Sequence, residues 1–367
     1  MKKIAVITNI IPEYRRGFLN TLYEDYKEHK VVFFCQRELK GINHNVILEN
    51  EFPGLIRYVN YLSMGSNIFT WQFLPYFSLL HRFDVFVITG NPRVLSSVFL
   101  SLIARLFRKK IVVWGHVRTA GSSGWSRKLR LYWWFLFPSA LTYTEQEIID
   151  LKKYGYKGRV LSINNGVDYH SIRKNFISCG HKIDPEERLK ARKIITCCRL
   201  IKKNKIGDLL DALYEIKSEI TGLSYDIIGD GPLRSYYDNQ VKRLGLEDVV
   251  NFHGAIYDES KLAKLFNSAT FLVHPGAIGL SALHSLSYSV PIVTHDNPYE
   301  HMPEFSVLSH LKNSFLYSSE TNLSKVLRDI FSIDNDEYIK LIYSCSEVVR
   351  NKYNSRVMAK RLLESAE

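Results

Sequence analysis

Three short loops carry the residue types best suited to chemistry in this sequence. Each follows a short apolar run and precedes a stretch with helical spacing; they span Arg199 to Lys205, Gly229 to Pro232, and Pro275 to Gly279. A helix start presents free backbone N–H groups that attract anions, and Arg and Lys side chains pair with phosphate oxygens. The loops therefore predict a site for an anion such as a diphosphate. The alternatives are a solvated basic loop in the first case and a plain strand-to-helix turn in the second.

His116 is a further candidate because it ends the apolar run IVVWGH. Residues that contact ligands gather at the carboxyl ends of strands in parallel α/β sheets, and a strand over 110–115 would place His116 there. The alternative is a histidine that only satisfies the local structure.

The elements that must position these residues alternate between strands and helices. Apolar runs predict strands over 3–9, 31–35, 84–89, 110–115, 140–143 and 160–163, and then over 193–198, 224–228, 249–253, 270–274 and 292–295. Short apolar runs of this kind are typical of parallel strands buried on both faces. The polar stretch 170–192 is predicted to be the crossing between two doubly wound α/β domains. We therefore expect domains over 1–168 and 169–354, with a final helix over 355–367.

The segment Val273–Val293, VHPGAIGLSALHSLSYSVPIV, resembles the signature segment of the retaining GT-B glycosyltransferases of family 4, the glycosyl transferases group 1. The strand–Arg…Lys–helix element at 199–205, GDGPL at 229–233, FHG at 252–254 and Pro303-Glu304 match that family in order and spacing. The resemblance implies two Rossmann-like domains facing an interdomain cleft, with the final helix packing back on the first domain.

The resemblance also implies an activity. It is the transfer of a sugar, with retention of configuration, from a nucleotide-diphosphate sugar to a glycan or polyprenyl-linked glycan acceptor. It implies no metal and no other cofactor, and the sequence has no DxD-type acidic pair in a suitable loop. By family habit the product belongs to a surface polysaccharide such as capsule, O-antigen or exopolysaccharide.

Site residues follow from the same resemblance. His116, Arg199 and Lys205 are the expected catalytic residues. The expected donor-binding residues are Gly17, Gly229, Gly231, Pro232, His253, Gly276, Ile278, Gly279, Leu280, His284 and Glu304. We expect the backbone N–H groups of Ile278, Gly279 and Leu280 to face the diphosphate. Arg15 or Arg16 in the first loop could also reach phosphate, or could be ordinary surface charges.

The chain departs from the family where two glutamates usually stand eight residues apart, because it has Gly276 and His284 there. A neutral histidine can still hydrogen-bond a ribose hydroxyl, whereas a glycine supplies no carboxylate. One hypothesis is an active enzyme with altered donor-sugar contacts. The alternatives are a catalytically silent relative that binds a glycan or a partner, and a nucleotide-sugar epimerase that needs no acceptor.

Charge is concentrated in the first half of the chain. Of the net charge of +12, most lies in residues 1–170, with 23 Lys and Arg against 12 Asp and Glu. Basic surfaces meet nucleic acid, anionic lipid or polyanionic substrates; no zinc-finger spacing or Arg-rich arm supports nucleic acid. The segment 126–137, with Arg127, Lys128 and Arg130 among aromatic residues, is either an interfacial helix on an anionic membrane or an ordinary amphipathic helix.

Compartment is indicated by the cysteines and by hydropathy. The five cysteines form no CxxC pair, which favours a reducing compartment. The apolar start of the chain is short and ends at Pro12-Glu13, so a first strand is expected rather than a signal peptide. No apolar run approaches the roughly 20 residues of a spanning helix. We expect a cytoplasmic protein, peripheral on the inner face of the membrane.

Overall fold

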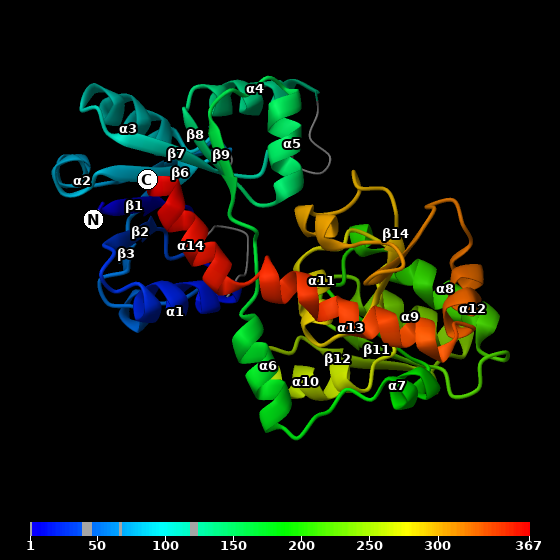
Figure 1. Ribbon diagram of the computed structural model, residues 1–367. Coiled ribbons are helices and arrows are strands. Elements are labelled where there is room, and N and C mark those ends of the chain that lie inside the picture. Colours follow the sequence, from blue (N-terminus) through cyan, green and yellow to red (C-terminus); the bar gives the residue numbers. More distant parts are fainter. Residues whose placement is uncertain (1, 39–45, 66–67, 118–123) are drawn as a thin grey trace. The chain divides into compact units, whose positions relative to one another are not determined.

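The computed structural model describes residues 2–38, 46–65, 68–117 and 124–367, without the side chains of 124–127. The described chain divides into two compact units (Figure 1). Unit 1 comprises Met1–Asp168 and Asn354–Glu367, and unit 2 comprises Tyr169–Tyr353.

Unit 1 is built on a parallel sheet. Its described residues form seven parallel strands in the order β3-β2-β1-β6-β7-β8-β9, and a separate antiparallel pair β4-β5. The strands are β1 Ile4–Ile7, β2 Val31–Cys35, β3 Ile56–Tyr58, β4 Tyr61–Met64, β5 Phe69–Gln72, β6 Val85–Thr89, β7 Lys110–Gly115, β8 Ser139–Thr142 and β9 Arg159–Ser162. The central strands β1 and β2 are buried along their whole length, because helices cover both faces of a parallel sheet.

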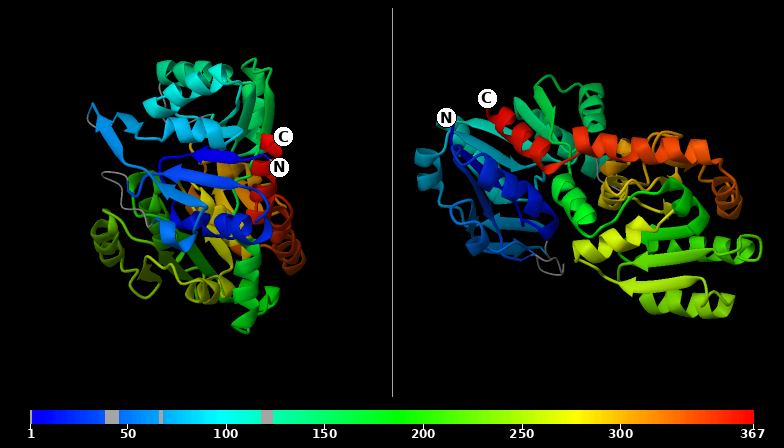
Figure 2. Two further views of the ribbon diagram at one scale, coloured as in Figure 1. Left: turned by 90° about the vertical axis from the view of Figure 1, so that its left-hand side faces the viewer. Right: turned by 60° about the horizontal axis from the view of Figure 1, so that its bottom comes forward.

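The helices of unit 1 come from both ends of the chain. They are α1 Arg16–Asp25, α2 Tyr76–Arg82, α3 Leu95–Leu106, α4 Gly124–Phe135, α5 Glu145–Lys153 and α14 Ser355–Ala366, with short 3-10 helices η1 Glu13–Arg15 and η2 Glu49–Glu51. On one face of the sheet α14 lies beside α1 (Figures 1 and 2). Met358 and Leu362 of α14 belong to the same buried cluster as Phe18 and Leu19 of α1. The opposite face is covered by apolar residues of α2, α3 and α4.

Unit 2 repeats the doubly wound pattern. Its six described strands are parallel, in the order β12-β11-β10-β13-β14-β15. They are β10 Lys193–Cys197, β11 Ser224–Ile228, β12 Val250–Gly254, β13 Phe271–Val273, β14 Ile292–His295 and β15 Ser314–Tyr317. Its helices are α6 Tyr169–Ser178, α7 Pro185–Ala191, η3 Lys202–Asn204, α8 Ile206–Ile216, α9 Arg234–Leu244, α10 Glu259–Asn267, α11 Leu280–Ser287, η4 Pro303–Val307, α12 Leu323–Phe331 and α13 Asn335–Asn351.

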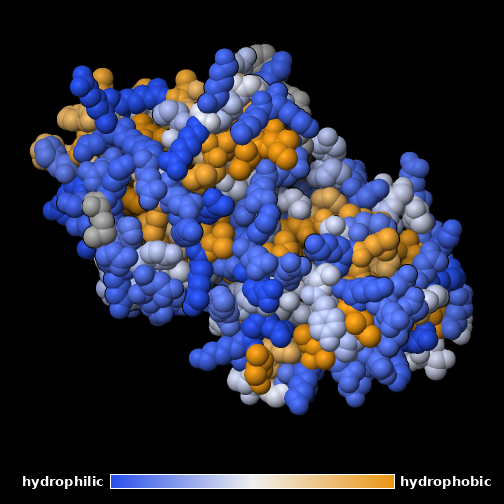
Figure 3. Space-filling model, in the orientation of Figure 1, coloured by the Kyte–Doolittle hydropathy of each residue, from blue (hydrophilic) through white to orange (hydrophobic). Residues whose placement is uncertain are grey.

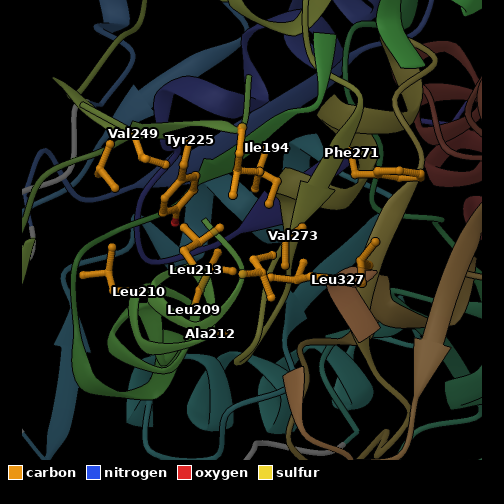
Figure 4. Packing of buried hydrophobic residues seen from close by; sticks show 14 of the residues in the cluster. Ile194, Leu209, Leu210, Ala212, Leu213, Tyr225, Val249, Phe271, Val273 and Leu327 are labelled. Carbon is orange, nitrogen blue, oxygen red and sulfur yellow. The ribbon is translucent and has the colours of Figure 1, made fainter. Parts of the chain in front are cut away.

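The core of unit 2 fixes the start of α8, and with it one of the three loops. Leu209, Leu210 and Leu213 project from α8 toward Ile194 and Tyr225 of the sheet (Figure 4). Leucines at this spacing form one apolar face of a helix. The packing therefore holds the loop before α8 at the end of β10.

The prediction that 170–192 is a crossing between domains is wrong, because this stretch forms α6 and α7 within unit 2. Arg188 explains why so polar a segment is packed. Its guanidinium is buried and donates to the backbone carbonyls of Asn267, Ser289 and Tyr288 at 2.9, 2.8 and 3.1 Å. Burial lowers the pKa of Arg188 to about 10. A charged side chain can thus be part of a core when carbonyl groups surround it.

The segment predicted to be an interfacial helix is α4. Trp133, Trp134 and Phe137 are buried, and the Trp134 indole N–H donates to the Gly90 carbonyl at 3.2 Å. The exposed apolar residues of this segment are Leu129, Tyr132, Phe135 and Leu136; the side chain of Arg127 lies outside the described residues. Figure 3 shows apolar atoms among hydrophilic ones over the region of α3 and α4. None of the described helices has the length and apolar character needed to cross a membrane.

Candidate functional site

In unit 2 the three loops meet at the carboxyl ends of β10, β11 and β13. The backbone N–H of Leu200 donates to the Asp230 carbonyl at 3.0 Å, and the Leu233 N–H donates to the Leu200 carbonyl at 3.1 Å. The Ala277 N–H donates to the Lys203 carbonyl at 3.1 Å. The loop that follows β10 therefore lies between the other two and is hydrogen-bonded to both.

Gly229 and Gly231 allow this close approach. Gly229 has a φ of 138°, and a Cβ added there would lie 1.9 Å from the Cys198 carbonyl oxygen. A Cβ on Gly231 would lie 2.5 Å from the Leu200 carbonyl oxygen. Only glycine tolerates such a backbone at these distances. Pro232 stands at the end of this loop, two residues before α9.

Gly276 is packed closely against the loop that follows β10. A Cβ at this position would lie 2.2 Å from the Lys203 carbonyl oxygen and 2.6 Å from Asn204. The space that a side chain at this position would need is thus occupied by the backbone of Lys203 and Asn204. A glutamate here would require the loop after β10 to move.

Arg199 and Lys205 differ in their surroundings. Arg199 is exposed, and among the described residues no acidic side chain pairs with its guanidinium. The Lys205 ammonium lies 2.9 Å from a carboxylate oxygen of Glu300, and this contact lowers the pKa of Glu300. Sequence patterns gave no signal for Glu300, because it lies 95 positions from Lys205. An anion can therefore approach Arg199 directly, whereas at Lys205 it would have to replace the carboxylate of Glu300.

At the start of α11 one of the three expected N–H groups is already occupied. The Ile278 N–H donates to Nδ1 of His301 at 3.2 Å, so the prediction that it faces a ligand is corrected. His301 in turn donates from Nε2 to the His295 carbonyl at 2.8 Å. Gly279 caps the helix and Leu280 begins it; N–H groups in the first turn of a helix have no acceptor within that helix. These two positions remain suited to an anion.

A layer of histidines underlies this helix start. The rings of His295 and His301 stack with centroids 4.0 Å apart, and His301 stacks on Phe305 at 4.3 Å. Burial lowers the pKa of His301 to about 4, and it lowers the pKa of the nearby, fully buried His274 to about 4 as well. These rings are neutral at pH 7 and act as hydrogen-bonding groups within the core.

Glu304 and His284 lie near the same helix. The Glu304 side chain is buried, and one of its carboxylate oxygens lies 3.9 Å from the position of a Cβ on Gly279. His284 is partly buried one turn into α11, and burial lowers the pKa of its ring. Glu259 opposes that shift, and it also accepts a hydrogen bond from the Tyr288 hydroxyl. Glu259 is thus a carboxylate near His284 that the sequence patterns did not single out.

Two expected donor-binding residues, His253 and Gly17, have close contacts within their own unit. His253 contacts the buried Asp226 carboxylate through Nε2 at 2.8 Å, and Lys193 pairs with the same carboxylate at 2.9 Å. Gly17 is buried in α1, and a Cβ there would lie 2.4 Å from Cβ of Asp168. The structure therefore uses Gly17 for close packing within unit 1.

His116 lies in unit 1, at the end of β7. Its ring stacks on Tyr143 with centroids 4.0 Å apart, and its Nδ1 is 3.7 Å from the Glu147 carboxylate. Glu147 accepts the backbone N–H groups of Val117 at 3.0 Å and Tyr143 at 2.9 Å. The carboxylate thus fixes the two segments that hold the ring. His116 borders a cavity of about 260 Å³ that also contacts Arg15.

The comparison with protein families concerns the segment that contains all three loops. Residues 181–340 match the glycosyl transferases group 1. A curated relative, the alpha-monoglucosyldiacylglycerol synthase of Streptococcus pneumoniae, is 28% identical over 109 residues. That similarity covers 29% of this chain, and the chain spans about a quarter (24%) of the relative's length.

Solved structures agree over the whole chain. Anabaena HepE, crystallised with UDP, has a TM-score of 0.70 at 14% identity over 100% of this chain and 99% of its own. A variant of S. aureus TarM, in complex with Fondaparinux, alpha-GlcNAc-glycerol and UDP, has a TM-score of 0.66 at 10% identity, covering 100% of both chains. The fold is GT-B, and the segment of unit 2 that holds the three loops is similar to the glycosyl transferases group 1.

Proposed function

We propose that this protein transfers a sugar from a nucleotide-diphosphate sugar to a glycan or lipid-linked glycan, with retention, in the assembly of a surface polysaccharide. The observation that carries the proposal is the loop after β10, which holds the exposed Arg199 and is hydrogen-bonded to two glycine loops, one of which leads into α11. The UDP bound to HepE and the glycolipid made by the streptococcal relative support the substrate classes. The basic first half of the chain suits an acceptor that carries negative charge.

Charge on the leaving diphosphate grows in the transition state, so catalysis needs positive groups placed in advance. We assign this role to Arg199, to Lys205 after exchange of Glu300, and to the N–H groups of Gly279 and Leu280. These groups could act without a metal. His116 of unit 1 is assigned to a hydroxyl of the reacting sugar or acceptor, to which an imidazole nitrogen can hydrogen-bond.

Release of nucleoside diphosphate tests the proposal. The full chain is incubated with UDP-, GDP-, ADP- and dTDP-sugars, with and without diacylglycerol or polyprenyl-phosphate-linked glycan acceptors, and with EDTA in a parallel series. Acceptor-dependent release that His116→Ala reduces at least tenfold, and that EDTA leaves unchanged, is the expected result. Conversion of the donor sugar without an acceptor would identify an epimerase, and binding without release would identify a silent relative. Analysis of the product's anomeric configuration tests retention.

His284 is proposed to bind the ribose in place of the family's glutamate. We expect His284→Ala to weaken binding of the accepted nucleoside diphosphate about tenfold, the loss of one hydrogen bond to a buried group, and His284→Gln to restore part of it. Isothermal titration measures both dissociation constants. Unchanged affinity in His284→Ala would show that another group, such as Glu259, binds the ribose.

Peripheral contact with an anionic membrane on its cytoplasmic face remains a prediction. The exposed residues Leu129, Tyr132 and Leu136 of the α4 segment are its basis. Sedimentation with anionic and with neutral vesicles tests this prediction. Binding to anionic vesicles alone would support membrane contact, and binding to neither kind would indicate an ordinary packed helix.

A further inference from the structure

The charged side chains that line the cavity beside His116 in unit 1 are all basic. The cavity lies at the carboxyl ends of β1, β6 and β7, where Thr8, Asn91 and His116 are among its lining residues. Arg15 and Arg130 also line it, whereas none of the described lining residues is an Asp or a Glu. Low-dielectric walls strengthen the field of such charges.

Arg15 is the central group of this cavity. It is only 7% exposed, and its guanidinium lies 5.5 Å from the ring centroids of both Trp114 and Tyr143. Among the described residues, its guanidinium, which has five N–H donors, donates to the Met358 sulfur at 3.7 Å. A thioether is a weak acceptor. No carboxylate among the described residues pairs with Arg15. Cation–π contacts offset only part of the cost of burying an arginine charge.

Two other arginines of this protein, Arg16 and Arg188, have several strong acceptors each and provide a comparison for Arg15. Arg16, the next residue, pairs with the carboxylates of Glu13 and Glu51. Arg188, buried like Arg15, donates to three backbone carbonyls. Arg15 has neither kind of partner, so its fork of donors is left for a group from outside the chain.

Arg130 and His116 also favour an anion in this cavity. Arg130 is partly buried; burial lowers the pKa of its guanidinium, and repulsion from Arg93 lowers it further. Glu147 opposes this shift, but its two oxygens also accept the backbone N–H groups of Val117 and Tyr143. His116 Nδ1 makes no hydrogen bond within the described residues. An oxyanion in the cavity would meet two guanidinium groups and an imidazole.

We propose that this cavity binds an anionic group of the acceptor, a phosphate or a carboxylate carried on a sugar or polyol, and that Arg15 determines this specificity. The inference rests on the proposed transferase function, which it deepens by naming the acceptor class. A volume of about 260 Å³ lies just below the range of typical ligand pockets, which suits one monosaccharide-sized unit. Planar guanidinium groups bind both kinds of oxyanion in a bidentate manner.

The test uses the full chain and small probes, so that it does not depend on turnover. Glycerol 3-phosphate and glucuronate are titrated against their neutral counterparts glycerol and glucose, by ligand-observed NMR. Wild type is expected to bind at least one anionic probe and neither neutral one. Arg15→Gln is expected to weaken that binding at least tenfold, and the matched control Arg16→Gln less than twofold. The dissociation constant of UDP should change less than twofold in Arg15→Gln.

Three results would overturn the proposal. They are equal binding of neutral and anionic probes, no anion binding by wild type at 20 mM, and a tenfold loss of UDP affinity in Arg15→Gln, which would assign Arg15 to the donor diphosphate. If Arg15→Gln does not fold, Arg130→Gln decides in its place, with a fivefold loss of anion binding supporting the proposal and no loss overturning it. Failure of the donor-turnover assay would refute the transferase function without altering these binding results.

Discussion

Replacing Arg199 by alanine is expected to lower kcat/KM for sugar-nucleotide turnover by about 100- to 1000-fold, the range seen when one preorganised donor to a developing negative charge is removed. Arg199 is exposed and has no acidic partner among the described residues, so its removal breaks no ion pair. The melting temperature should therefore stay unchanged while turnover falls.

The matched control is Arg243→Ala, because Arg243 is also an exposed arginine of unit 2 but lies in the last turn of α9. It should retain full activity. Initial rates of nucleoside-diphosphate release over a range of donor concentrations separate kcat from KM. A loss of similar size in both variants, or none in Arg199→Ala, would remove Arg199 from the site and leave Lys205 as the main cation.

Acidification from pH 7.5 to pH 5.0 is expected to lower the free energy of unfolding by about 4 kcal/mol through His274 and His301 alone. Each has a pKa of about 4 in the folded protein against 6.5 for the free side chain. Between these values the unfolded chain binds more protons than the folded one. The stability is therefore complete above about pH 6.5 and is lost as the pH falls toward 4, by about 2 kcal/mol per histidine at pH 5.0.

Urea unfolding at the two pH values measures this difference. His274→Asn should remove about half of it, whereas His170→Asn, at an exposed position of α6, should leave it unchanged. If the two variants show the same pH dependence as wild type, His274 is not a neutral buried group. The effect should appear in unit 2, whose core holds both rings.

The alternation of strands and helices could be predicted from the sequence because buried parallel strands need unbroken apolar runs, as in β1 and β2. The glycine loop at 229–231 was recognisable for a similar reason: local backbone geometry demands glycine there. Both signals lie within a few residues of the feature that they predict.

The remaining features depend on partners that are distant in sequence. The Ile278 N–H is occupied by His301, 23 positions away, and the buried Arg188 finds its acceptors 79 to 101 positions away. Arg15 differs from Arg16 in lying against the distant rings of Trp114 and Tyr143, whereas Arg16 pairs with the carboxylates of Glu13 and Glu51. No local pattern carries that information, so these roles could be assigned only from the structure.

The position of α14 has a consequence for how the chain is made. Asn354 pairs with Val167 in a parallel bridge, so the two places where the chain passes between the units lie side by side. Unit 1 is formed by two separate stretches of the sequence, because α14, which packs on α1, comes after all of unit 2. During synthesis, unit 2 is therefore complete on the ribosome while the apolar face formed by Phe18 and Leu19 still awaits Met358 and Leu362. Of the two units, unit 1 therefore begins before unit 2 and is completed after it.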